Sequence, residues 1–271
     1  MDMSNFWKRT ITGVLLVAVL IGGMLWSSWS YGILFLIISL LGVVELANLF
    51  LQKGVKVQVA TPLVIAISIF GIIFFQKLGY NFPLIYLSIP ILGIFTIELF
   101  LNRENSLNNM VYSIFIPLYV ALPVALLNDV AFFGGDYNSA LLLSFFALIW
   151  SNDTGAYLVG SSIGKHPLLK RISPKKTIEG FLGGVVIVQL VSVALFYLTK
   201  DVLSLRDWMI IGLLISFGGT IGDLVESLIK RNLEVKDSGS ILPGHGGILD
   251  RFDALYFAAP LVACYLYYIS H

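Results

Sequence analysis

Charged residues are scarce in this chain. Only 12% of its 271 residues are Asp, Glu, Lys or Arg, whereas 58% are hydrophobic and the mean hydropathy is +0.90. Soluble domains carry about 25% charged residues, so the composition excludes a soluble globular protein. The formal net charge of +1 is less informative than the distribution of the charges. The composition predicts a polytopic membrane protein.

Cysteine is almost absent. Cys264 is the single cysteine of the chain and lies in an apolar run. An intramolecular disulfide and a cysteine-based metal site are therefore excluded. Internal repeats, low-complexity tracts and a soluble domain are also lacking. The apolar run that follows Lys8 and Arg9 is long and has no clear cleavage site, which predicts a retained first span rather than a signal peptide.

Apolar segments of membrane-spanning length, by contrast, fill most of the chain. The predicted fold is therefore an all-α polytopic membrane protein with about nine transmembrane helices. The approximate limits of these spans are residues 11–29, 31–51, 60–76, 82–101, 108–127, 139–160, 179–199, 205–230 and 248–269.

The positions of Lys and Arg predict how these spans are oriented. If the N-terminus is cytoplasmic, all but three of the 17 basic residues fall on cytoplasmic ends or loops. The exceptions are Lys77, Lys200 and Arg206. Cytoplasmic loops are enriched in Lys and Arg, so the bias predicts a cytoplasmic N-terminus and a C-terminus on the opposite side.

The linker near residues 102–109 suggests a division into two regions. Residues 1–104 are predicted to form a scaffold of spans one to four, and residues 105–271 to hold spans five to nine. The catalytic site would be built from spans six, eight and nine and their cytoplasmic loops. In the scaffold, Glu45 and Glu98 lie near the cytoplasmic ends of spans and are interpreted as solvated end residues or packing contacts.

The most informative stretch runs from Gly222 to Asp253, between the last two apolar segments. Asp223, Ser227 and Lys230 are spaced at i, i+4 and i+7, with Arg231 next to Lys230, which places all four on one stripe of a helix. The stripe places the Asp223 carboxylate inside a predicted span. Favourable interaction of a charge with a helix end does not explain Asp223, because it lies within the helix.

A polar, turn-rich loop follows this helix. It carries Lys236, His245, Gly246 and Gly247, and the next helix opens with residues 250–253, which include Asp250, Arg251 and Asp253. Carboxylates bind metal ions, while Lys, Arg and glycine amides bind phosphates. This juxtaposition predicts a metal–phosphate site. The charges at the two helix ends could also simply complement the helix dipoles, and His245 could be an ordinary turn residue.

Two earlier segments add to this site. Asp153 lies in the polar end of span six, where a carboxylate costs roughly 3 kcal/mol unless it faces a polar cavity. Lys175 and Lys176 follow Ser173 and Pro174, which are predicted to be the N-cap and the first residue of a helix. Two lysines in a first turn suggest a bound polyanion. Asp153 could instead be a structural hydrogen-bonding residue.

These residues also carry a family resemblance. The stretch resembles, spacing included and without departure, the signature of phosphatidate cytidylyltransferases, also called CDP-diacylglycerol synthases. The matching residues are Ser227, Lys230, Arg231, Lys236, Asp237, Gly239, Pro243, His245, Gly246, Gly247, Asp250, Arg251 and Asp253. The similarity extends to Asp153–Tyr157 and to residues 173–180, and so covers most of the C-terminal half.

The resemblance implies a Mg²⁺-dependent nucleotidyltransferase that makes CDP-diacylglycerol and pyrophosphate from CTP and phosphatidate in phospholipid biosynthesis. It implies a multi-pass protein surrounded by membrane lipids in a bacterial-type inner membrane, with the active site facing the cytoplasm. Nucleic acid is not an expected partner. A second cation and a homodimer stay open.

The roles expected for individual residues follow the chemistry of their side chains. Asp223, Lys230, Arg231, Lys236, His245, Asp250 and Arg251 are the expected catalytic residues. Lys175, Lys176, Ser227, Gly246 and Gly247 are expected to bind substrate phosphates. Asp223 and Asp250 are the expected metal ligands, with Asp153 and Asp253 as further candidates.

Other functions share part of this pattern. A CTP-dependent kinase or a cytidylyltransferase for an isoprenoid lipid would need similar metal and phosphate groups. An ion-coupled transporter could also use buried acids, but transporters place their sites near the membrane midplane, often between inverted repeats. Here the charges gather toward one membrane face and no repeat is evident.

Overall fold

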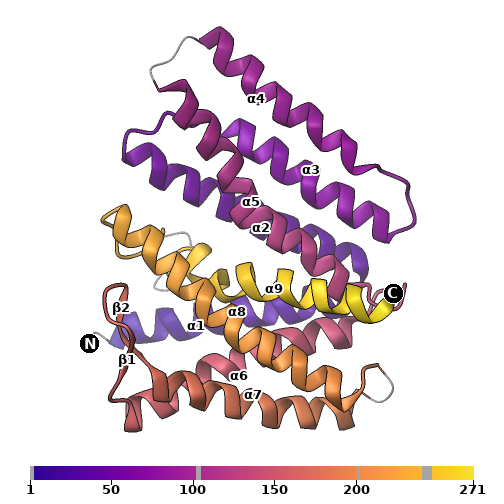
Figure 1. Ribbon diagram of the computed structural model, residues 1–271, viewed down its shortest axis with the longest axis vertical. Helices are drawn as coiled ribbons and strands as arrows, with labels where there is room; N and C mark the ends of the chain where they lie inside the picture. The colour runs from indigo at the N-terminus through magenta and orange to yellow at the C-terminus, as the bar shows by residue number, and fades with distance from the viewer. Residues whose placement is uncertain (1–2, 102–104, 200–201, 240–245) are drawn as a thin grey trace. The chain divides into compact units, whose positions relative to one another are not determined.

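The computed structural model describes residues 3–101, 105–199, 202–239 and 246–271, with side chains described from Thr10 onward. Within these ranges the chain is almost entirely helical (Figure 1). The elements are α1 (Met3–Trp26), α2 (Ser28–Gln52), α3 (Ala60–Lys77), the 3-10 helix η1 (Leu84–Leu87), α4 (Ser88–Leu101), α5 (Ser106–Ala131), α6 (Ser139–Ile163), β1 (Pro167–Leu169), β2 (Ser173–Thr177), α7 (Ile178–Leu198), α8 (Leu205–Asn232) and α9 (Leu249–Ser270).

The all-α class predicted from the apolar segments is confirmed. Among the described residues, seven helical segments are long and apolar enough to cross a membrane: α2, α3, Leu84–Leu101, α5, α7, α8 and α9. The apolar part of α1, Thr10–Trp26, is shorter. The chain is therefore an integral membrane protein with several spans. The count of nine spans and the orientation of the termini stay predictions.

The chain forms two compact units that interleave along the sequence. The first comprises residues 1–128 and 233–251, and the second residues 129–232 and 252–271. The division between residues 104 and 105 concerns the roles of the two regions and stays a prediction.

In the first unit, helices that follow one another in sequence pack together: α1 on α2, α2 on α3, and α3 on α4. Tyr31, Phe35 and Leu46 of α2 are fully buried. The start of α2 is set by a capping box, in which the Ser27 hydroxyl accepts a hydrogen bond from the Ser30 amide and the Ser30 hydroxyl accepts one from the Ser27 amide. This pair satisfies amides that have no partner inside the helix.

In the second unit, α7 packs against both α6 and α8 (Figure 1). The buried residues of α7 recur at every fourth position: Gly180, Gly184, Val188 and Ser192. Small residues at this spacing let helix backbones approach closely in a membrane. A Cβ atom on Gly184 would lie 2.9 Å from Asn152 Oδ1 of α6. The α6–α7 contact therefore depends on the small residues of α7.

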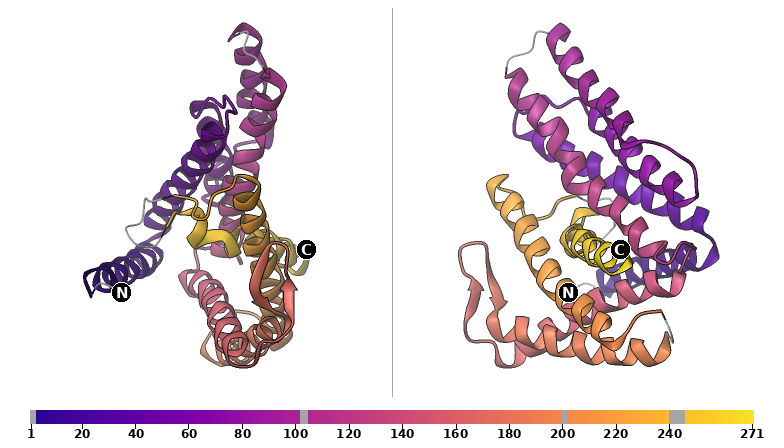
Figure 2. Two further views of the ribbon diagram at one scale, coloured as in Figure 1. Left: turned by 90° about the vertical axis from the view of Figure 1, so that its left-hand side faces the viewer. Right: turned by 45° about the vertical axis from the view of Figure 1, so that its right-hand side comes forward.

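A short hairpin joins α6 to α7 and corrects one prediction (Figures 1 and 2). Strand β1 pairs antiparallel with β2, so Ser173 and Pro174 are strand residues, and their predicted role as N-cap and first helical residue is wrong. Thr177 is the N-cap of α7, since its hydroxyl accepts a hydrogen bond of 3.1 Å from the Gly180 amide. Proline disfavours helical geometry in the residue before it, which suits Ser173 to a strand.

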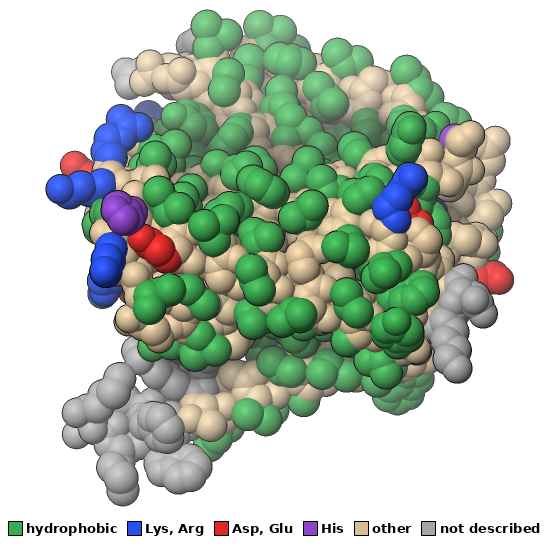
Figure 3. Space-filling view, turned by 60° about the horizontal axis from the view of Figure 1, so that its bottom comes forward, with side chains coloured by type: hydrophobic (Ala, Val, Ile, Leu, Met, Phe, Trp, Pro, Cys, Tyr) green, Lys and Arg blue, Asp and Glu red, His purple; other side chains and the backbone are tan. Residues whose placement is uncertain are grey.

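The opposite face of α7 is apolar and open. Leu182, Val186 and Leu190 recur at every fourth position and are 54%, 58% and 63% exposed. Figure 3 shows hydrophobic side chains spread over one face of the molecule, with charged side chains gathered toward its edges. Such a face suits contact with lipid chains, where apolar side chains need no cover.

The packing of α8 on α9 provides a test. A Cβ atom on Gly222 would overlap the main-chain oxygen of Asp253, whereas one on Gly219, a turn earlier, would meet Ala254 Cβ at an ordinary 3.4 Å. Gly222→Ala is therefore expected to lower the free energy of unfolding by about 1–3 kcal/mol. Thermal unfolding in detergent would measure the effect, with Gly219→Ala as the matched control. Equal stability of the two variants would contradict this contact.

Candidate active site

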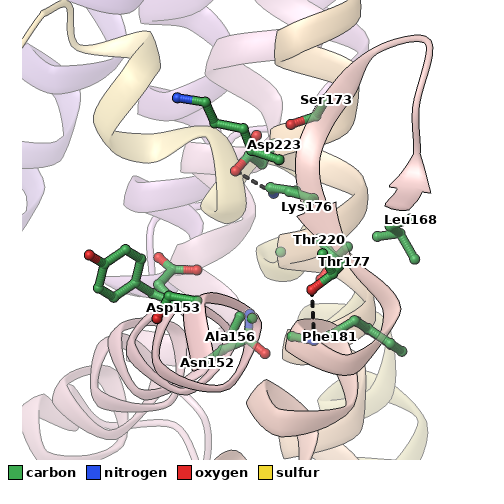
Figure 4. Close-up of a pocket in the computed structure, with 16 residues that line it drawn as sticks. Asn152, Asp153, Ala156, Leu168, Ser173, Lys176, Thr177, Phe181, Thr220 and Asp223 are labelled. Carbon is green, nitrogen blue, oxygen red and sulfur yellow. Dashed lines mark hydrogen bonds and ion pairs between the residues drawn. The ribbon is translucent and has the colours of Figure 1, made fainter. Parts of the chain in front are cut away.

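Acidic and basic side chains from separate elements meet in the second unit. Lys176 of β2 forms an ion pair with Asp223 of α8, and Asp153 of α6 lines the same cavity (Figure 4). The carboxylates of Asp153, Asp223 and Asp253 lie close enough to interact electrostatically with one another and with Lys176. These four residues were expected from the sequence to converge, and within this unit they do.

A cavity of about 550 Å³ lies beside this cluster. Its wall comes from α6, the β1–β2 hairpin, α7 and α8. The lining side chains that can bind a ligand through charge or hydrogen bonds are Asn152, Asp153, Tyr157, Ser161, Ser173, Lys175, Lys176, Thr177, Thr220 and Asp223. Both lysines predicted to bind phosphate therefore face the cavity that holds two of the predicted acids. Sequence reasoning missed Thr177 and Thr220 as lining residues.

The hairpin that carries the two lysines is held in place by Glu179. One carboxylate oxygen of Glu179 accepts hydrogen bonds from the main-chain amides of Lys165 and His166, at 3.1 and 3.2 Å. The other lies 2.5 Å from His166 Nδ1. Glu179 is in the first turn of α7, where a negative charge is favourable. The start of the hairpin is thus fastened to the helix that follows it.

The polar stripe of α8 is present, with one unexpected partner. Ser227 Oγ lies 3.3 Å from Asp223 Oδ1, one turn away. Lys230, however, forms an ion pair of 2.6 Å with Glu226, whose side chain is almost fully buried. Glu226 was not singled out by sequence reasoning, although its i, i+4 spacing to Lys230 is a recognisable signal. Arg231 is exposed at the end of the stripe.

The loop before α9 belongs to the first unit and is built around Asp250. Asp250 Oδ2 accepts hydrogen bonds from the main-chain amides of Ser238 and Gly247, at 3.1 and 2.9 Å. It also lies 2.9 Å from the Ser238 hydroxyl, whose single proton can be donated either to Asp250 or to Glu45. The Gly247 amide, which is expected to bind phosphate, donates to Asp250 in the structure. Gly246 has a φ of +80°, a conformation that favours glycine.

Two other predicted residues of this region, Lys236 and Arg251, are exposed. His245 lies outside the described residues.

Of the two interpretations of Glu45 and Glu98, the solvated end residue is wrong and the packing contact agrees with the structure. Both are only 4% exposed. Glu45 accepts hydrogen bonds from Ser238, Ile248 and Leu249, in the same loop that surrounds Asp250. An acid in an apolar segment was the available signal for Glu45. Its partners, however, lie 193, 203 and 204 positions away in the sequence, where local patterns cannot identify them.

The acids of the second unit suit a magnesium ion. Among the described residues, no three His, Cys, Asp or Glu side chains form a ready metal-binding group. Mg²⁺ usually takes only one or two carboxylates and completes its shell with water and substrate phosphates. Asp153 and Asp223 line one cavity together with Lys175 and Lys176. The two carboxylates suit a magnesium ion, and the two lysines suit phosphate groups bound beside it.

Comparison with known proteins identifies several phosphatidate cytidylyltransferases as relatives. A phosphatidate cytidylyltransferase of Staphylococcus aureus strain COL is 50% identical over 123 residues, which is 45% of this chain and 46% of the relative. That of Bacillus subtilis strain 168 is 53% identical over 116 residues, 42% of this chain and 43% of the relative. That of Staphylococcus haemolyticus is 47% identical over 121 residues, 45% and 46% of the two chains. The match thus spans a little under half the length of each relative.

A family model covers much more of the chain. The model described as the cytidylyltransferase family matches residues 7–269. This match includes both units and every charged residue discussed above. With its helical membrane fold and its cluster of acids and lysines, this chain belongs to the cytidylyltransferase family.

Proposed function

We propose that this protein transfers a cytidylyl group from CTP to phosphatidate, giving CDP-diacylglycerol and pyrophosphate, as a step of phospholipid biosynthesis. The observation that carries the proposal is the cavity in which Asp153 and Asp223 lie beside Lys175 and Lys176. The relatives from Staphylococcus aureus and Bacillus subtilis are named for this activity. A transporter or an isoprenoid-specific enzyme is not favoured.

The chemistry explains why such a cavity is needed. An oxygen of the phosphatidate phosphate attacks the α-phosphorus of CTP, the bond from that phosphorus to the bridging oxygen breaks, and pyrophosphate leaves. Both reactants are anions, so charge repulsion is a main part of the barrier. Lys175 and Lys176 line the cavity and would offset this repulsion. A strong general base is not needed, because the second pKa of a phosphate monoester is about 6.

Asp153 and Asp223 would hold the magnesium ion, because they line the same cavity. When bound, Mg²⁺ neutralises phosphate charge and favours departure of pyrophosphate. The same role is proposed for Asp250 from the family resemblance alone. Asp253 belongs to the electrostatic cluster and is the candidate for a second cation.

The remaining predicted residues are proposed to bind the triphosphate, the pyrophosphate or the lipid phosphate. Ser227 orients Asp223 through their 3.3 Å contact. The others are proposed on the resemblance and on charge: Lys230, Arg231, Lys236, His245, Gly246 and Arg251.

The active site is proposed to face the cytoplasm of a bacterial-type inner membrane. The bias of Lys and Arg toward one side of the spans supports this orientation. CTP would then arrive from the cytoplasm, while the acyl chains of phosphatidate stay in the lipid. The exposed apolar stripe of α7 suits such contact with the membrane.

The activity can be tested on the purified full-length chain in detergent or liposomes. Each labelled nucleoside triphosphate is incubated with Mg²⁺ and either phosphatidate or a prenyl phosphate, and the lipid products are identified. We expect CDP-diacylglycerol and pyrophosphate from CTP and phosphatidate, with no turnover when magnesium is chelated. A phosphorylated lipid and CDP, or preferential use of the prenyl phosphate, would contradict the proposal.

A further inference from the structure

The structure buries one carboxylate that the proposed mechanism does not use. Glu45 of α2 is only 4% exposed. Its Oε1 accepts hydrogen bonds from the Ser238 hydroxyl and, at 3.2 Å, from the Leu249 amide, and its Oε2 accepts one of 2.8 Å from the Ile248 amide. A buried carboxylate is costly unless hydrogen bonds compensate it. Here all three donors come from the segment 238–249, in the same unit of the chain.

Two of these donors are at the start of α9. The Ile248 and Leu249 amides precede the first complete turn of that helix, where main-chain amides lack partners within the helix. A negative charge at a helix N-terminus is also favourable. Glu45 therefore caps α9 from a distant helix and fixes where α9 begins, one residue before Asp250.

Two glycines of the family signature make room for Glu45. A Cβ atom on Gly239 would lie 2.8 Å from Glu45 Cδ, and one on Gly247 would overlap Glu45 Oε1. Glycine at these two positions is therefore explained by the approach of this carboxylate. Described residues near both ends of this segment, Gly239 and Gly247, therefore lie against Glu45.

The third donor connects Glu45 to Asp250. The Ser238 side chain is 3% exposed, and its hydroxyl contacts Glu45 on one side and Asp250 Oδ2, at 2.9 Å, on the other. Ser238 also donates its main-chain amide to Asp250. Ser238 thus contacts both carboxylates, so a shift of Glu45 would also shift Asp250.

We propose that Glu45 is a positioning residue, which acts through Ser238 and the start of α9 to hold the Asp250 carboxylate in its working position. The inference rests on the proposed function only for the role of Asp250. The hydrogen bonds that fasten the loop are independent of the substrate. Loss of an outer partner of a metal ligand commonly lowers activity about 10- to 100-fold.

A matched control lies at the C-cap of α2. Lys53 forms an ion pair of 2.9 Å with Glu234, two residues after the end of α8. The hydrogen bond and positive charge of Lys53 lower the pKa of Glu234. Both side chains are substantially exposed, and exposed ion pairs contribute little to stability. Lys53→Gln therefore removes a contact between the end of α2 and the chain just before the loop. It leaves no buried polar group without a hydrogen-bond partner.

Hydrogen–deuterium exchange of the full-length chain tests the positioning directly. In Glu45→Ala, the amides of residues 246–249 are expected to exchange about tenfold faster than in the wild type, as the loss of a buried hydrogen bond implies. Peptides from α7 and from the middle of α9 should exchange unchanged, which shows that the protein is folded. Lys53→Gln should leave the loop as in the wild type. Unchanged exchange of residues 246–249 in Glu45→Ala would overturn the proposal.

Kinetics then separates positioning from a direct role. Glu45→Gln keeps the size of the side chain and one acceptor oxygen, so we expect it to lose about tenfold in kcat, with Glu45→Ala losing about 100-fold. The Mg²⁺ concentration for half-maximal activity should rise in the same order, while the KM for CTP stays near the wild-type value. Equal activity of Glu45→Ala and the wild type would refute the proposal. If residues 246–249 exchange faster in Glu45→Ala but the wild-type protein makes no CDP-diacylglycerol, the positioning role of Glu45 stands and the proposed function is rejected.

Discussion

Asp223→Asn is expected to lower kcat/KM for CDP-diacylglycerol formation by at least about 100-fold, the effect commonly seen when a group that stabilises transition-state charge is removed. Asp223 lines the cavity, forms the ion pair with Lys176 and contacts Ser227. An amide has almost the same shape but no charge. It would bind Mg²⁺ poorly and would leave Lys176 without its ion-pair partner. The measurement is turnover of labelled CTP over a range of Mg²⁺ concentrations.

The control for this variant is Asp207→Asn, at the other end of the same helix. Asp207 accepts hydrogen bonds from Ser204 and, at 2.7 Å, from the Tyr265 hydroxyl, and it is not among the cavity-lining residues. The same change of charge there should cost some thermal stability and leave turnover near the wild-type level. If Asp223→Asn retained near-normal turnover, the assignment of Asp223 to the metal would be wrong.

Lys176→Gln is expected to lower kcat/KM for CTP by about 100-fold, with most of the loss in kcat if Lys176 acts on charge that develops in the transition state. Lys176 is the cation that reaches Asp223 inside the cavity. Its removal leaves the carboxylates of Asp153, Asp223 and Asp253 to repel one another and the incoming triphosphate. Binding of CTP, measured separately, would show how much of the effect is in the ground state.

Lys170→Gln is the matched control, because Lys170 lies on the same hairpin connection but is exposed and does not line the cavity. It removes the same charge from the same region of the chain. If the two variants lost equal activity, general attraction of anions to the hairpin would explain the effect. Lys176 would then have no specific role in the cavity.

The positions of the helices could be predicted well from the sequence. Each predicted span falls mainly on one α-helix, although span 11–29 also reaches the start of α2 and span 82–101 includes η1. This agreement has a physical cause, because the thickness of a bilayer sets the length of an apolar segment. The β1–β2 hairpin was missed. Ser173 and Pro174 have the local chemistry of a helix start, but pairing with Pro167–Leu169 holds them in a strand. Whether a short strand forms depends more on the strand that pairs with it than on the intrinsic preference of its own residues.

The candidate site could be predicted in part. Asp153 and Asp223 stood out because a carboxylate in an apolar span is costly and needs a reason. Glu45 gave the same signal, but its partners are the Ser238 hydroxyl and the start of α9, and no sequence spacing relates them. The Lys230–Glu226 pair was within reach of local reasoning and was overlooked.

The sequence by itself determined that this protein is a helical membrane protein of the cytidylyltransferase family, and which acids and lysines are candidates for its chemistry. These conclusions depend on composition, on segment length and on residue spacing within single elements. Only the tertiary structure decided that Lys176 pairs with Asp223, that one cavity joins them to Asp153, and that Glu45 holds the loop around Asp250. The physical reason is that the partner of a buried charge is chosen by distance in space, which separation along the chain does not report.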